Sequence, residues 1–229
     1  MIKKGGSAER QLKLFVYGEA FAGKTYFAST FPKPLILSTD GNAQYFDVDY
    51  IEVKSVEDYE KALDYFMNQE HDYETLVIDN LNQLFQFVRK YYLDKQGIIY
   101  EGDANDHGKT WKMVRLGFLE TLKPLNNIKD KNWIVIDHMR TRVDVDQLGM
   151  ETTYYEPMLD DTKENIHGEI MLMTTFTCRA TTIGKEHKIS LGHTGNELTG
   201  VRLPIKETLI ENTYDAFMEN LKWKNYKLD

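Results

Sequence analysis

Cysteine is nearly absent from this sequence of 229 residues, which contains only Cys178. One cysteine cannot form an internal disulfide, and no group of cysteines and histidines has the spacing of zinc ligands. These absences exclude a disulfide framework and a zinc-binding module, and they favour a reducing cytoplasm as the compartment.

Long apolar runs and an excess of positive charge are also lacking. The N-terminal residues 1–10 have no signal-peptide core, and no later run approaches the length of a membrane span. Twenty-eight Lys and Arg residues against 36 Asp and Glu give a net charge of -8, which repels nucleic acid and anionic lipid at long range. We therefore expect a soluble protein that does not act at a membrane and that contacts DNA only locally.

The composition, with 41% hydrophobic and 28% charged residues, is that of one α/β domain. No linker, internal repeat or low-complexity tract divides the chain. We predict a single domain over residues 1–229, with a polar leader at 1–10 and with residues 140–229 completing the domain.

Short apolar runs alternate with segments of helical periodicity. Strands are predicted at Leu12–Tyr17, Pro34–Thr39, Thr75–Ile78 and Trp133–Ile136, and helices at 24–31, from Ser55 through Phe66, at 81–92 and at 111–125. This alternation predicts a mostly parallel sheet flanked by helices. The acidic segment Glu101–Gly108 has no periodicity and is interpreted as an exposed loop.

The pattern changes after Arg140. Residues 170–183 favour a strand, and Gly184-Lys185-Glu186 offers a turn into a second strand at His187–Leu191. We predict a C-terminal β-hairpin extension here and a last helix at about Thr213–Leu221.

The segment from Gly18 to Thr25 matches the phosphate-binding pattern G-x-x-x-x-G-K-[ST] between a predicted strand and a predicted helix. We call this segment the P-loop. Backbone N–H groups and the helix N-terminus favour an anion, Lys24 reaches the β and γ phosphates, and Thr25 offers a hydroxyl to Mg²⁺. The sequence therefore predicts a site for ATP, or for GTP, with Mg²⁺. The predicted nucleotide-binding residues are Gly18, Glu19, Ala20, Phe21, Ala22, Gly23, Lys24, Thr25 and Tyr26.

Asp79 follows the apolar run Leu76-Val77-Ile78 and is interpreted as the second Mg²⁺ ligand, usually through water. An Asp in this position can instead be only a helix cap. Asn80 stands where many P-loop ATPases carry a glutamate that activates water.

The missing glutamate directs attention to two other strand ends. Asp40 follows a strand that ends at the P-loop edge of a parallel sheet, where it can polarise the attacking water; Asp40-Gly41-Asn42 can equally be a simple turn. His138 ends the fourth predicted strand at the same edge, where it can contact the γ-phosphate or be only structural. With Lys24, these two residues are the predicted catalytic groups.

Several cations are candidates for an arginine finger supplied to a neighbouring subunit, which would imply a homo-oligomer: Arg140, Arg142, Arg179, Lys185 and Lys188. None differs in sequence from an ordinary surface charge. The group Lys185, His187 and Lys188 is also a candidate for contact with single-stranded DNA, with Tyr154 and Tyr155 as stacking platforms.

Gly18 to Thr25, Ser38-Thr39-Asp40, Leu76 to Asp79 and Val135 to His138 together resemble phage-encoded P-loop nucleotide-binding proteins, related to core-only RecA-like ATPases. The resemblance covers about residues 12–205. It implies a RecA-like fold of the AAA/ASCE class, with Asp40 as catalytic base and His138 as polar sensor.

The same resemblance implies a role in recombination or replication of phage DNA inside the host cell, alongside a single-strand binding protein. The sequence departs from RecA in lacking an N-terminal polymerisation helix and long basic DNA-binding loops. Three functions are therefore compared: a slow ATPase acting on DNA, a nucleotide-dependent binding module with little turnover, and a P-loop kinase. The kinase is ranked last because Glu101–Gly108 contains no lid arginine.

Overall fold

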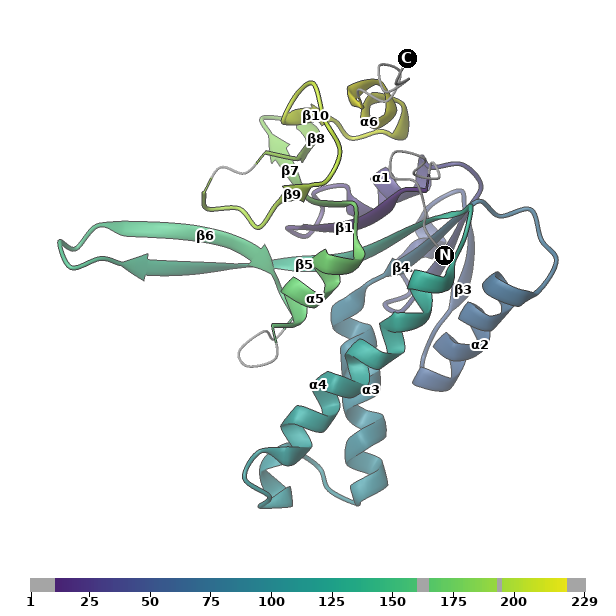
Figure 1. The fold of residues 1–229 in the computed structure, drawn as a ribbon, viewed down its shortest axis with the longest axis vertical. Helices are drawn as coiled ribbons and strands as arrows, with labels where there is room; N and C mark the ends of the chain where they lie inside the picture. The colour runs from purple at the N-terminus through teal and green to yellow at the C-terminus, as the bar shows by residue number, and fades with distance from the viewer. Residues whose placement is uncertain (1–10, 160–164, 193–194, 222–229) are drawn as a thin grey trace, which may run out of the picture.

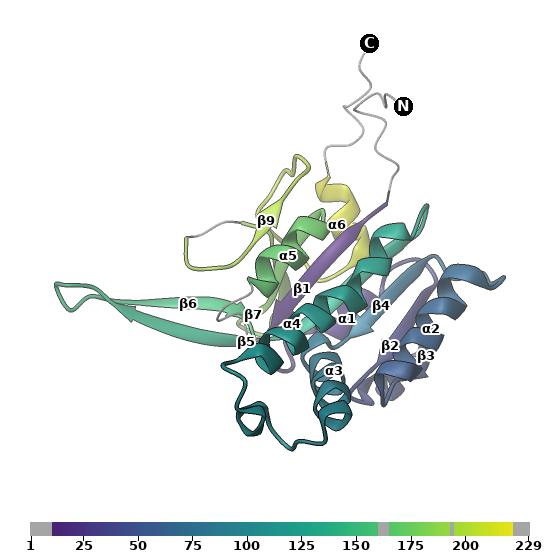
Figure 2. The same cartoon turned by 60° about the horizontal axis from the view of Figure 1, so that its bottom comes forward.

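A computed structural model describes residues 11–159, 165–192 and 195–221. The predicted leader at 1–10 lies outside the described residues. Figures 1 and 2 show one central twisted sheet with helices on both faces and a two-stranded arm, β5–β6, that extends away from it. No helix in the described part of the chain is long and apolar enough to cross a membrane.

The sheet has the strand order β10-β8-β7-β1-β5-β4-β2-β3, with β6 paired to β5 and β9 paired to β7. The strands are β1 (Lys13–Gly18), β2 (Pro34–Ser38), β3 (Asp49–Glu52), β4 (Thr75–Asp79), β5 (Asn132–Val145), β6 (Glu151–Pro157), β7 (Phe176–Ile183), β8 (Glu186–Ser190), β9 (Gly200–Val201) and β10 (Leu209–Glu211). From β7 to β3 the neighbours are parallel, whereas β8, β10, β9 and β6 join antiparallel. The predicted mostly parallel sheet flanked by helices is confirmed.

Helices divide between the two faces of the sheet. The α-helices are α1 (Lys24–Ser29), α2 (Val56–Asn68), α3 (Leu81–Gln96), α4 (Lys109–Leu122), α5 (Ile166–Met173) and α6 (Tyr214–Asn220), and short 3-10 helices occur at Asn42–Tyr45, Glu101–Ala104 and Lys123–Asn127. One buried cluster joins α2, α3, α4 and α5 to the sheet, and the other joins α1 and α6. Along β1, Phe15 faces the first cluster while Leu14 and Val16 face the second, because strand side chains alternate.

One sequence prediction in the C-terminal part, the start of the strand predicted at residues 170–183, is corrected. Ile170 to Met173 is helical, as the end of α5, and the strand β7 begins only at Phe176. An unbroken apolar run hid the helical spacing of the buried residues Ile166 and Ile170. The hairpin itself is present, turning at Gly184 with φ of 64°. Its first strand is part of the central sheet, where β7 pairs with β1.

The fourth predicted strand is much longer than expected. It runs to Val145, so His138 lies inside β5 and not at its end. The continuation pairs with β6 to form the arm, which the sequence did not predict because its residues are polar and exposed. The segment Glu101–Gly108 also differs from a simple exposed loop. Glu101 is buried and accepts hydrogen bonds from Arg89 at 2.6 and 2.8 Å.

The C-terminal helix α6 holds the P-loop helix α1 against the sheet. The ring centroid of Phe217 lies 6.0 Å from that of Phe27 and 6.3 Å from that of Phe31, and Phe217 is fully buried. The Tyr214 N–H donates to Thr30 Oγ1 at 2.8 Å. The end of the described chain is therefore built into the same core as the P-loop.

We propose that the chain is one cooperative domain, and this predicts the effect of Phe217→Ala. Removing a fully buried aromatic ring should lower the free energy of unfolding by about 3–5 kcal/mol. Leu172→Ala, at a side chain that is 68% exposed, is the control and should cost less than about 0.5 kcal/mol. Urea unfolding followed by circular dichroism measures both. A separate early transition for the C-terminal part would contradict the single domain.

Candidate nucleotide site

The loop between β1 and α1 is held by close backbone contacts that require glycine. A Cβ on Gly18 would lie 2.3 Å from the carbonyl oxygen of Ala180 on β7. Gly23 has φ of 83°, in the left-handed region that other residues rarely adopt. The loop therefore keeps its backbone open toward the N-terminus of α1, as a phosphate-binding loop requires.

Lys24 lies inside this loop and is buried. Its Nζ donates to the carbonyl oxygens of Gly18 at 2.9 Å and Glu19 at 2.7 Å. Burial lowers the pKa of Lys24, and the negative charges of Asp79, Asp137 and Asp40 act in the opposite direction. The ammonium group is thus placed where its attraction for an anion is little screened by water.

Thr25 and Asp79 are brought together as the sequence predicts. The Thr25 hydroxyl donates to Asp79 Oδ2 at 2.6 Å. Burial raises the pKa of Asp79 to about 6, against the hydrogen bond from Thr25, and the charge of Asp40 raises it further. Two hard oxygen donors side by side next to a phosphate-binding loop fit Mg²⁺, which takes one or two protein ligands with phosphate and water.

Strand register explains why residues far apart in sequence meet at one edge. Gly18 is level with His138, and Asp79 is level with Ser38 and Ile136. Because these strands are parallel, the residues that follow them emerge on the same side of the sheet. The predicted shared edge is confirmed, although His138 occupies it from within a strand.

Asn80 connects Asp40 and His138, two of the three predicted catalytic residues, a role that sequence reasoning missed. Its Nδ2 donates to Asp40 Oδ2 at 3.1 Å and lies 3.3 Å from His138 Nε2. Its Oδ1 accepts from the Gln83 N–H at 2.9 Å and caps α3. The Oδ1 contact fixes which end of the amide faces His138. Because Nδ2 can only donate, His138 Nε2 must be the acceptor and therefore carries no proton. The only sequence signal was an Asn at a helix N-cap.

The electrostatics of His138 agree with this neutral form. Burial lowers the pKa of His138, and the positive charge of Lys24 lowers it further, while Asp40 acts in the opposite direction. The imidazole therefore carries its proton on Nδ1 and presents a neutral, polar group at the site.

Asp40 both stabilises a turn and lies at the candidate site, the two alternatives that the sequence left open. It forms the turn, because Oδ1 accepts from the Asn42 N–H at 3.0 Å. It also reaches the site through Asn80, while its side chain remains exposed to solvent. An exposed carboxylate at the edge of a phosphate site can hold a water molecule.

Asn212 and His187 also border the P-loop; the sequence gave no signal for Asn212 and indicated His187 only as a candidate for contact with DNA. Asn212, 189 positions from Gly23, donates from Nδ2 to the Gly23 carbonyl at 3.0 Å. Its buried Oδ1 has no hydrogen-bond partner in the described part of the chain. A Cβ on Gly23 would lie 2.4 Å from Asn212 Nδ2 and 3.3 Å from the His187 ring. The C-terminal strands thus form one wall of the P-loop.

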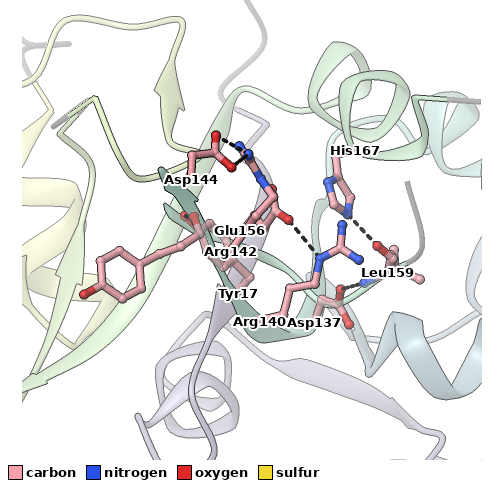
Figure 3. A network of polar contacts seen from close by, with 9 residues as sticks. Tyr17, Asp137, Arg140, Arg142, Asp144, Glu156, Leu159 and His167 are labelled. Carbon is pink, nitrogen blue, oxygen red and sulfur yellow. Dashed lines mark hydrogen bonds and ion pairs between the residues drawn. The ribbon is translucent and has the colours of Figure 1, made fainter. Parts of the chain in front are cut away.

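Asp137, next to His138, is fully buried and anchors the base of the arm. Its Oδ2 accepts from the Leu159 N–H at 3.0 Å (Figure 3), and its Oδ1 has no partner among the described residues. Burial raises the pKa of Asp137 to about 7, while the hydrogen bond from the Leu159 N–H acts in the opposite direction.

Four of the five predicted finger residues, all except Lys185, are paired with carboxylates of their own chain in the described structure. Arg140 donates to Glu156 at 2.9 Å, and Arg142 pairs with Asp144 (Figure 3). The other engaged candidates are Arg179, paired with Glu197, and Lys188, paired with Glu186 and Glu211.

Both tyrosines predicted as stacking platforms for DNA are also engaged within the chain, and Lys188 is ion-paired as described above. The guanidinium groups of Arg142 and Arg179 lie over the rings of Tyr154 and Tyr155, at 4.6 and 4.0 Å. The structure therefore does not gather the predicted cations and tyrosines into one free basic surface.

Comparison with known proteins places the chain in a family. A family model described as "AAA domain" matches residues 10–200. No curated protein matches the sequence. Fifty chains of solved structures match, among them the "Crystal structure of the RadB recombinase". That match has a TM-score of 0.43 and 11% identity, and it covers 78% of this chain and 79% of the other, too distant to carry a functional argument.

The raised pKa of Asp137 predicts a pH dependence of stability. A folded-state pKa of about 7 against an ordinary value of 3.8 means that ionising Asp137 costs folding free energy. The contribution of Asp137 to the free energy of unfolding is therefore fully present below pH 3.8, where the carboxyl is protonated in both states, and it is lost as the pH rises to about 7. Asp137→Asn keeps an acceptor for Leu159 and should therefore gain stability relative to wild type as the pH rises from about 4 to about 8. Thermal unfolding across this range measures the difference, with Asp47→Asn as an exposed control. A difference independent of pH would contradict the assignment.

Proposed function

Because the chain belongs to the AAA domain family, we propose that it is a RecA-like ATPase that binds MgATP and hydrolyses it slowly. The observation that carries the proposal is the joint placement of Lys24, the Thr25–Asp79 pair and Asn80 at one edge of the sheet. Each part of this arrangement has a separate use in phosphoryl transfer.

The phosphates bind in the P-loop in this proposal. Backbone N–H groups of the loop and the N-terminus of α1 hold the anion, and Lys24 exchanges its carbonyl hydrogen bonds to Gly18 and Glu19 for phosphate oxygens. Thr25 and Asp79 would hold Mg²⁺, and the bound ion would supply positive charge that offsets the charge of the triphosphate. The residues that would contact the phosphates and Mg²⁺ do not distinguish ATP from GTP. We propose ATP because of the family resemblance.

Asp40, Asn80 and His138 act at the γ-phosphate end in this proposal. Asp40 accepts the proton of the attacking water, and the Asn80 amide fixes the orientation of both neighbours. His138 donates from Nδ1 to a phosphate oxygen. Aspartate is one methylene shorter than glutamate, so the carboxylate reaches water less readily, and turnover is slow.

We further propose, on the family resemblance, that the cycle serves recombination or replication of phage DNA, with single-stranded DNA and a single-strand binding protein as partners in the host cytoplasm. A neighbouring copy in a homo-oligomer would supply the cation that completes the site, and Arg140 or Arg179 would have to exchange the carboxylate of its own chain for phosphate to do so. The acidic net charge of -8 makes any DNA contact local.

A second candidate function is a nucleotide-dependent assembly module with little turnover. Asn80 favours it, since this position holds an amide that hydrogen-bonds its neighbours where a glutamate would activate water. A kinase for a small substrate remains last. The segment where its lid would lie contributes the buried Glu101 to an ion pair with Arg89, which is partly exposed, and the segment contains no arginine of its own.

An ATPase assay with and without single-stranded DNA separates the first two functions. We expect slow release of phosphate that DNA stimulates, and Lys24→Ala should abolish both nucleotide binding and turnover because it removes the phosphate-binding cation. Lys61→Ala, at an exposed position on α2, is the matched control. Tight MgATP binding without turnover, with or without DNA, would establish the assembly module instead.

Asp40→Asn tests the proposed base. The amide keeps the shape of the side chain and loses proton affinity, so nucleotide binding should stay within about twofold of wild type while kcat falls at least about 100-fold. Asp47→Asn, a nearby exposed aspartate, should change neither quantity. Normal hydrolysis by Asp40→Asn would show that another group activates the water.

A further inference from the structure

The arm formed by β5 and β6 is ordered without support from the rest of the domain along most of its length. Every residue from Thr141 to Thr152 is exposed, and the arm extends away from the sheet in both views (Figures 1 and 2). A two-stranded hairpin alone is at best marginally stable in water. A sequence that nevertheless specifies such an arm implies a surface for the arm to contact.

The tip of the arm presents apolar side chains from a fixed turn. Val145, Leu148 and Met150 are 62%, 88% and 67% exposed. The turn is organised by Asp146, whose Oδ1 accepts from the N–H groups of Leu148 at 2.8 Å and Met150 at 2.9 Å. This turn holds the apolar side chains in place, which lowers the entropy cost of docking them.

The charge around these apolar residues selects the kind of partner. Between positions 142 and 152 the arm has three carboxylates, Asp144, Asp146 and Glu151, and one cation, Arg142, which pairs with Asp144. An acidic tip repels nucleic acid and anionic lipid. It fits a protein surface that is apolar and basic.

Helix α4 of the same chain carries a surface of that chemistry. Lys109, Lys112, Met113 and Leu116 follow the spacing i, i+3, i+4, i+7 and are all exposed, so they form one stripe. Met113 and Leu116 are 38% and 44% exposed. The opposite face of α4 is buried in the core, and the stripe therefore faces outward.

We propose that the arm tip docks on the α4 stripe of a second copy of this chain. The inference rests on the proposed homo-oligomer and does not depend on hydrolysis. The tip lies away from α4 of its own chain in both figures, so the contact joins two molecules. Two different surfaces meet, and the interface is head-to-tail, of the kind that closes a ring or grows a filament.

Such docking is connected to the nucleotide site through the backbone of the arm. Strand β5 runs without interruption from His138 to Val145. At the base of the arm the Tyr17 hydroxyl, from the strand that leads into the P-loop, donates to the Tyr155 carbonyl at 3.1 Å. A neighbour bound to the tip therefore contacts the same strand that carries His138.

The first test measures mass by light scattering after size exclusion, over a range of concentrations and with and without MgATP. Wild type should assemble, while Leu148→Asp on the tip and Leu116→Asp on the stripe should each remain monomeric. Leu172→Asp places the same substitution at another exposed leucine, 68% exposed, and should assemble as wild type does. Circular dichroism verifies that each variant is folded.

Mixing the two monomeric variants identifies the geometry. Each keeps the surface that the other has lost, so the intact tip of Leu116→Asp can dock on the intact stripe of Leu148→Asp. A one-to-one heterodimer that grows no further is expected. A pair of charge variants provides a second line should either leucine variant fail to fold: Glu151→Lys and Lys112→Glu should each weaken assembly, and combining both in one chain should restore it.

Several results would overturn the proposal. These are a wild-type chain that is monomeric under all conditions, a mixture in which no heterodimer forms, or assembly that depends on Leu148 but not on Leu116. The last result would indicate that two arms pair with each other. Because mass is the readout, absence of ATP hydrolysis would defeat the proposed function without affecting this test.

Discussion

The parallel pairing of β1, β5, β4 and β2 is the constraint on which the site depends. No two of the site residues Lys24, Asp40, Asp79 and His138 are neighbours in sequence, yet register brings Gly18 level with His138 and Asp79 level with Ser38. A slip of one residue in any of these pairings would turn every side chain of that strand to the other face. The two faces pack different side chains, with Phe15 in one core cluster and Leu14 and Val16 in the other, so a slip would disrupt the close packing of both clusters. The chemistry at the edge is thus positioned by packing in the middle.

Burial at this edge creates an electrostatic balance that no single residue explains. The side chains of Lys24, Asp79 and Asp137 are all buried. Burial favours the neutral form of each, so it lowers the pKa of Lys24 and raises the pKa of Asp79 and of Asp137. Their opposite charges compensate one another in part, and in the proposed function a magnesium triphosphate would add further charges of both signs at this edge. A site that is already desolvated yields stronger interactions with phosphate than an exposed one, and this accounts for the use of buried ionisable groups where stability alone would favour apolar ones.

The sequence predicts the parts of the structure that follow from local pattern. The P-loop, the strand before Asp79 and the shared sheet edge rest on short-range signals: glycines at fixed spacing, apolar runs and turns. What it misses depends on contacts between distant segments. Nothing near Asn212 indicates that it reaches Gly23, and nothing in Asn80 indicates that its amide joins Asp40 to His138. Ile170–Met173 is misjudged for a related reason, since an apolar run is equally a buried strand or a buried helix until its neighbours are known.

The arm is a second kind of structure that sequence pattern does not predict, because its strands bury no face in a core and so show no hydrophobic periodicity. Hydrophobic periodicity predicts strands that bury a face in their own domain, and between Thr141 and Thr152 no residue is buried. Such a segment depends for its order on contacts at its base. There the Leu159 N–H donates a hydrogen bond to Asp137, and Arg140 donates to Glu156. Order at the base fixes the direction of the arm, while the bare tip keeps its apolar residues for another surface. The cost of exposing Leu148 and Met150 falls on the isolated chain, and it is removed when a complementary surface covers them.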